Sequence, residues 1–174
     1  MFVASHVYEL PFGRGKRWMS SGPGAAILGG WQTNGVYRKV SGAPFTPTAD
    51  ATACNCPGNN NFADSIGPTK YLGGQGRGLF WFDVASFAPP GANRFGNAGR
   101  NSLRGPGFAT YDLSAVRNFR LRERLRLELR GEAYNVTNSP RWGNPTNSVN
   151  NGSFGQILSA SSEREIQIAV RITF

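Results

Sequence analysis

The chain has 174 residues, of which 39% are hydrophobic, 23 are glycine and 11 are proline. Aromatic residues make up 12% of the chain, more than a disordered chain of such low hydrophobicity carries. No apolar run approaches the roughly 20 residues of a spanning helix, which excludes a helical membrane protein. A β-barrel is still allowed, because its strands need only about 9–11 residues and only every second one must be apolar.

The formal net charge of +9 suits either nucleic acid or an anionic membrane surface. Two classes of soluble protein therefore stand as alternatives to a membrane barrel. One is a basic β protein that binds nucleic acid, and the other is a surface β protein used in adhesion. The distribution of the basic residues favours the membrane, because they gather in the shorter turns and are scattered elsewhere.

The first two predicted strands cover residues 2–10 and 30–40. The connection between them is rich in glycine, proline and basic residues, from Pro11 to Pro23. Trp18 lies beside the basic residues of this connection. Basic turns flanked by aromatic residues are typical of one membrane–water interface.

A long connection follows over residues 43–106, rich in proline, glycine and asparagine. It contains Cys54 and Cys56, which are either loop thiols or a small local disulfide, because a disulfide framework or a zinc site needs more partners. The glycines at 73–78 are not followed by the Lys-Ser/Thr of a phosphate-binding loop. A connection of this length is unusual in a compact soluble domain and common in an outer-membrane barrel.

Residues 108–119 form the next predicted strand. Apolar and polar residues alternate along it, although Arg117 interrupts the apolar side. Only residues 120–124 separate this strand from the following one, so the two strands are predicted to form a tight antiparallel hairpin.

Residues 125–136 alternate between leucines and charges. Leu125, Leu127 and Leu129 are predicted to face lipid, while the lumen side carries Arg126, Glu128, Arg130 and Glu132. An amphipathic helix is the alternative, because Leu121, Leu125 and Leu129 are spaced by four. Leu127 would lie off the apolar stripe of that helix, and Gly131 would weaken its interior.

The clearest alternation covers residues 164–174. The even positions Ile166, Ile168, Val170 and Ile172 are predicted to face lipid, and Arg171 is predicted to face the lumen. Phe174 ends the alternation. Another connection, rich in asparagine and serine, precedes this strand over residues 137–162.

In chain order, the four connections between the predicted strands are of moderate, long, short and long length. In an up-and-down barrel successive connections alternate between the two ends, so both long ones belong to one end, taken as extracellular. The predicted fold class is therefore all-β. We expect an antiparallel up-and-down segment of a transmembrane β-barrel in the bacterial outer membrane, with about five strands and long extracellular loops.

No enzyme is expected. His6 is the only histidine, and Glu128 and Glu132 are interleaved with arginines, so an ion-pair ladder in the lumen explains them better than acid–base chemistry. No catalytic, cofactor or metal site is predicted.

Several short segments, in their order and spacing, resemble the C-terminus of Oar-like TonB-dependent receptors, a family of large outer-membrane proteins that often carry a carboxypeptidase-regulatory-like domain. The segments are 29–32 (GGWQ), 41–45 (SGAPF), 81–83 (WFD), 95–101 (FGNAGRN), 103–107 (LRGPG), 112–114 (DLS), 117–119 (RNF), 132–135 (EAYN) and the terminal alternating strand.

This resemblance implies a 22-stranded barrel with an internal plug, energised through TonB. It also implies that Phe174 is read by the barrel-assembly machinery. The chain shows no signal peptide, plug or TonB-contacting segment, so residues 1–174 are predicted to be the C-terminal portion of such a receptor. The expected partners are outer-membrane lipid, the remainder of the barrel and plug, the TonB complex and the assembly machinery, without nucleic acid.

Overall fold

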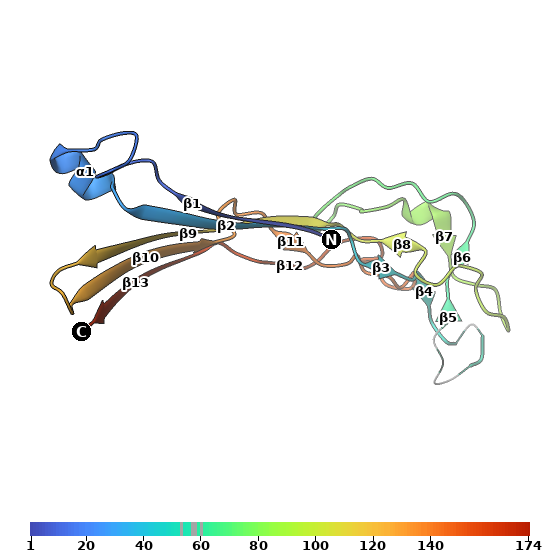
Figure 1. The fold of residues 1–174 in the computed structure, drawn as a ribbon. Helices are drawn as coiled ribbons and strands as arrows, with labels where there is room; N and C mark the ends of the chain where they lie inside the picture. Colours follow the sequence, from blue (N-terminus) through green and yellow to red (C-terminus); the bar gives the residue numbers. More distant parts are fainter. Residues whose placement is uncertain (53, 57–58, 60) are drawn as a thin grey trace. The chain divides into compact units, whose positions relative to one another are not determined.

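The computed structural model describes residues 1–52, 54–56, 59 and 61–174 (Figure 1). The chain forms two compact units. The sheet unit comprises Met1–Val40, Ala109–Ser139 and Ser162–Phe174, and the loop unit comprises Ser41–Phe108 and Pro140–Ser161. Each unit has its own internal structure. Within the described part of the chain, no helix is both long enough and apolar enough to cross a membrane.

The sheet unit is built on five long strands. They are β1 (Phe2–Glu9), β2 (Trp31–Val40), β9 (Phe108–Arg120), β10 (Arg126–Tyr134) and β13 (Glu165–Thr173). They form one antiparallel sheet in the order β1-β2-β9-β10-β13 (Figure 1). Each long strand is hydrogen-bonded to the long strand that follows it in the sequence. The prediction of five strands in up-and-down order is confirmed.

The structure corrects the strand predicted over residues 125–136, which is shorter at both ends. Leu125 lies in the hairpin turn, where its amide donates to the carbonyl of Arg122 (3.2 Å) and its carbonyl accepts from the amide of Leu121 (2.9 Å). The strand ends at Tyr134 because Asn135 adopts a left-handed conformation with φ 47°. The helical alternative for residues 121–129 is wrong.

The connection between β1 and β2 is more ordered than the sequence indicates. It contains a helix, α1 (Gly22–Leu28), that was not predicted. Pro23 occupies the first turn, where its missing N–H costs little. Seven residues are too few to produce a helical periodicity in the sequence, which explains why α1 was missed.

The loop unit is built from short paired strands. Its elements are β3 (Pro44–Phe45), β4 (Thr48–Ala49), β5 (Asn61–Phe62), β6 (Asp64–Ser65), η1 (Val84–Ser86), β7 (Phe87–Ala88), β8 (Leu103–Arg104), β11 (Arg141–Trp142) and β12 (Ala160–Ser161). The pairs are β3 with β8, β4 with β5, β6 with β7, and β11 with β12. Of the predicted connection 43–106, residues 53, 57, 58 and 60 lie outside the described part.

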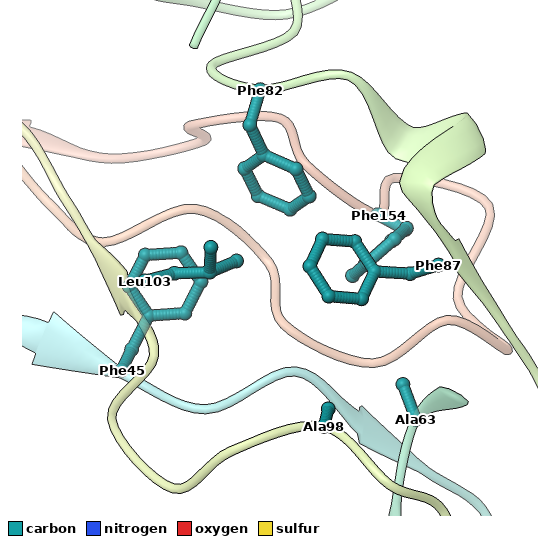
Figure 2. Packing of buried hydrophobic residues seen from close by; sticks show 7 residues of the cluster. All are labelled: Phe45, Ala63, Phe82, Phe87, Ala98, Leu103 and Phe154. Atoms are coloured by element: carbon teal, nitrogen blue, oxygen red, sulfur yellow. The ribbon is translucent and has the colours of Figure 1, made fainter. Parts of the chain in front are cut away.

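A small aromatic core holds the loop unit together. Figure 2 shows its seven buried side chains, which are Phe45, Ala63, Phe82, Phe87, Ala98, Leu103 and Phe154. The ring centroid of Phe82 lies 5.3 Å from that of Phe154 and 5.7 Å from that of Phe87. The interplanar angles of the two pairs are 78° and 86°. Edge-to-face aromatic pairs of this kind add to the stability gained from burial. Phe154 belongs to the second long connection, so the two connections share one core.

Backbone hydrogen bonds join the same two connections. The amide of Thr48 donates to Asn147 (2.8 Å), the amide of Val149 donates back to Thr48 (2.9 Å), and Trp81 donates to Gly155 (2.8 Å). Close packing adds to this, because a Cβ atom at Gly155 would lie 2.6 Å from the Cγ1 atom of Val84. Cys54 and Cys56 form the small local disulfide that was one of the two alternatives.

Candidate lipid-facing and lumen-facing surfaces

The register of β10 fixes which side chains share a face of the sheet. Leu127 lies opposite Ile172 and Leu129 lies opposite Val170, while Gly131 and Ala133 lie opposite Ile168 and Ile166. On the other side of β10, Leu127 lies opposite Phe119. Directly opposed residues lie on the same face. We call this face the apolar face, and it consists of Leu113, Ala115, Phe119, Leu127, Leu129, Ala133, Ile166, Ile168, Val170 and Ile172.

The aliphatic side chains of β13 are exposed rather than packed in a core. Ile168 is 84% exposed, Ile166 is 68% exposed and Val170 is 61% exposed. A contiguous apolar surface of this kind is rare on a soluble monomer and marks a surface that meets lipid or another protein. Ile166, Ile168, Val170 and Ile172, which are predicted to face lipid, lie together on this exposed face. Leu125, also predicted there, lies in the turn before β10.

The opposite face carries the predicted lumen residues. Glu128 lies opposite Arg171, and Arg126, Arg130 and Glu132 lie on the same face. The guanidinium of Arg130 contacts the carboxylates of Glu128 (3.0 Å) and Glu132 (3.7 Å). Exposed ion pairs of this kind add little to stability. The ion pairs indicate instead that this face is suited to contact with water, and we call it the polar face.

The polar face continues toward β2. The side-chain amide of Asn34 donates to the hydroxyl of Ser114 (3.2 Å), which joins β2 to β9 on this side of the sheet. A hollow of about 200 Å³ lies here, lined by Asn34, Val36, Asp112, Leu113, Ser114, Glu132 and Tyr134. Hydrogen-bonding groups from three strands therefore converge on one part of the polar face.

Aromatic residues lie at both ends of the apolar face. His6 lies opposite Gly35 and stacks on Tyr111 (ring centroids 6.2 Å apart), which places the even positions of β1 on this face. Phe2 and Tyr37 meet at the end where the long connections attach, with centroids 6.3 Å apart. Tyr8 and Phe119 lie toward the other end. Aromatic girdles at both edges of an apolar band are typical of outer-membrane barrels. The pair formed by Phe2 and Tyr37 could be recognised only from the register between β1 and β2.

Arg117 is a charged residue on the apolar face, opposite Leu129. Its guanidinium donates hydrogen bonds to the carbonyls of Ala26 and Ile27 at the end of α1. It also lies 4.2 Å from the ring centroid of Phe119. The helix carbonyls and the ring compensate the charge of Arg117, since both present partial negative charge to a cation.

Phe174 follows β13 and is 96% exposed. It continues the even-numbered series of Ile166, Ile168, Val170 and Ile172. No group of three or more metal-ligating side chains occurs in residues 1–52, 54–56, 59 and 61–174.

Comparison with known proteins agrees with this geometry. The family model described as "Outer membrane beta barrel domain" matches residues 1–167. No curated protein and no solved structure gave a match. The matched region contains the first four long strands, both long connections and the start of β13. The chain therefore belongs to the outer membrane β-barrel domain family and localises to the bacterial outer membrane.

Proposed function

We propose that this chain forms the C-terminal wall of the barrel of a TonB-dependent receptor, which takes up its substrate only as the complete protein. The chain itself carries out no catalysis in this proposal. The observation that carries the proposal is the segregation of the sheet into an apolar and a polar face in one hydrogen-bonded register. Such a wall separates lipid from a wet, plugged interior.

The two edges of the sheet, unpaired in the described part of the chain, support the proposal that the chain is part of a larger barrel. β1 and β13 lie at the ends of the strand order, and the side chains of both strands are exposed along their whole length. An unpaired strand edge in hydrocarbon costs several kcal/mol for each unsatisfied backbone group. In the proposal, further strands of the same protein cover both edges, and the polar face meets the plug. The remaining partners are lipid, the TonB complex and the assembly machinery, which reads Phe174.

Four of the segments that resemble Oar-like receptors have a structural role in the loop unit. Phe45 ends one segment, Phe82 is the centre of another, and Ala98 and Leu103 belong to two more. These four residues are part of the seven-residue core. The part of the resemblance that lies in residues 41–108 therefore includes residues that fold the loop unit, which supports a common loop architecture.

The orientation of the wall is tested with two neighbouring cysteine variants, Ile168→Cys and Gln167→Cys, each labelled with an environment-sensitive fluorophore in outer membranes. Because Cys54 and Cys56 are bonded to each other, only the introduced thiol reacts. Lipid-borne quenchers should act on position 168, and aqueous quenchers should act on position 167. The reverse pattern, or equal aqueous quenching at both positions, contradicts the proposed wall.

The receptor assignment is tested by the intact mass of the outer-membrane species that contains these residues. We expect a mass far above the 18.8 kDa of this chain, and uptake that stops when TonB is removed. A species of 18.8 kDa that closes a barrel from its own copies would refute the receptor proposal. The assignment to an outer-membrane barrel would be unaffected by that result.

A further inference from the structure

The connection between β1 and β2 folds into a compact element, here called the turn element and defined as residues 10–30. Phe12 and Trp18 form a β-bridge, and their ring centroids lie 5.8 Å apart. A Cβ atom at Gly29 would lie 2.7 Å from the Cα atom of Gly13. The backbone at Gly13 is therefore in direct contact with the backbone at the end of α1.

The turn element is fastened to the apolar face of the sheet. Arg117 donates to two carbonyls at the end of α1, and the indole N–H of Trp31 donates to the carbonyl of Ile27 (3.1 Å). Arg117 is on the apolar face because it opposes Leu129. The turn element thus lies on the side of the sheet that is proposed to meet lipid, at the end opposite the long connections.

A cleft of about 670 Å³ lies between the turn element and β9. Its lining residues are Arg14, Ser20, Ser21, Gly22, Ala25, Ala26, Gly29, Gly30, Arg117 and Phe119. Two of these residues are arginines, two carry hydroxyls, and none of these described lining residues is acidic. Guanidinium and hydroxyl donors in one cleft are suited to a phosphate group, which arginine binds through paired N–H donors.

Exposed apolar side chains belong to the same element. Ile27 is 67% exposed, Trp18 is 51% exposed and Met19 is 47% exposed. Together with Lys16, they give the element the composition of segments that lie at the membrane interface, with apolar groups in the acyl boundary and a cation at the headgroups.

From these four observations we propose that the cleft binds the phosphate of a phospholipid headgroup in the periplasmic leaflet of the outer membrane. Arg14 supplies a guanidinium, Ser20 supplies a hydroxyl, and the apolar side chains of the turn element contact the acyl chains. Arg117 is a positioning residue that holds α1 against β9. This inference rests on the proposed lipid-facing orientation of the sheet.

The test uses the protein extracted from outer membranes in a maltoside detergent. Native mass spectrometry then measures the occupancy of added phosphatidylglycerol. Arg14→Gln should lower the affinity about tenfold, the size expected for losing a hydrogen bond to a charged group. Arg17→Gln is the matched control, because it removes the same charge from the turn element without lining the cleft, and its affinity should stay within about twofold of the wild type.

A second variant keeps the test decisive if Arg14→Gln fails to assemble. Ser20→Ala should weaken the binding several-fold. Equal losses in Arg14→Gln and Arg17→Gln, or no loss in either, would overturn the cleft proposal. Competition by inorganic phosphate as strong as by phosphatidylglycerol would also overturn it, because the ligand would then be free phosphate. If the cleft shows no specific lipid binding while lipid-borne quenchers still act on position 168, this inference alone is refuted. If those quenchers do not act on position 168, the proposed wall is refuted.

Discussion

At the scale of single residues, the core of the loop unit is centred on one aromatic ring. Phe82 is fully buried and contacts the rings of Phe45, Phe87 and Phe154. Two residues away, Phe80 is 37% exposed and lies outside this core. The two phenylalanines therefore offer a matched pair with the same chemistry and different burial.

We expect Phe82→Ala to destabilise the loop unit by about 3–5 kcal/mol, because it removes a ring from a packed core and leaves a cavity. Phe80→Ala should cost about 1 kcal/mol or less, as surface substitutions usually do. Hydrogen exchange of the amides in β3, β7 and β8 measures the difference. Equal loss of protection in the two variants would show that the core does not depend on Phe82.

We expect Asp64 to give the loop unit a pH dependence. Hydrogen bonds from the guanidinium of Arg94, with a further bond from the amide of Asn97, hold the pKa of Asp64 below its usual value. A lowered folded pKa means that the stabilisation is complete above the pKa of the unfolded chain and is lost as the pH falls through the folded value.

Protection of the Asn97 amide, corrected for intrinsic exchange rates, should therefore fall when the wild-type protein is acidified below the usual aspartate pKa. In Asp64→Asn the protection should be lower at neutral pH and should change little on acidification. Parallel acid-induced losses in the wild type and the variant would assign the dependence to another group.

At the scale of elements, the long strands were predictable and the rest was not. Residues 165–173 alternate so regularly that their faces follow from the sequence alone, because a strand encodes its two faces at a spacing of two residues. The core of the loop unit joins Phe45, Phe82 and Phe154, which are separated by tens of residues and follow no period. The sequence shows the aromatic residues at 80–82 but cannot say which of them is buried.

The two predicted surfaces show the same limit. Alternation separated Leu127 and Leu129 from Glu128 and Arg130, as the register does, but it could not show that Leu125 belongs to the turn. The Phe2–Tyr37 girdle required the register between β1 and β2. The cleft beneath α1 required a helix too short to leave a periodic signal.

The proposed contact of β13 with lipid can be tested by measuring how an added charge changes the free energy of unfolding. Ile168→Arg should destabilise the assembled barrel by about 2–4 kcal/mol, the cost of an arginine on the lipid face near the middle of the bilayer. Gln167→Arg, one residue away on the polar face, should have an effect near zero. Urea unfolding in liposomes, followed by tryptophan fluorescence, measures both. Equal destabilisation by the two substitutions would contradict the assigned faces.

At the scale of the whole molecule, the two open edges decide how the chain behaves alone. β1 and β13 each have one neighbour in the sheet within the described residues. An exposed edge strand pairs readily with another chain. The apolar face adds a second reason for association in water.

We therefore expect the isolated 174-residue chain to self-associate in buffer without detergent and to insert poorly into liposomes. Sedimentation velocity over a range of concentrations measures the first property, and protease protection after mixing with liposomes measures the second. A monomeric, soluble preparation that melts cooperatively would refute both the lipid-facing sheet and the need for further strands.

The shared aromatic core of the loop unit also limits which segments of this chain can be exchanged. Because Phe154 from one connection fills the space between rings contributed by the other, neither connection can be exchanged with that of a related barrel by itself. A chimaera that transplants residues 41–108 alone would leave an unfilled apolar pocket, while one that carries residues 140–161 along with them would keep the packing intact. Residues 41–108 and 140–161 are therefore expected to be exchangeable only together.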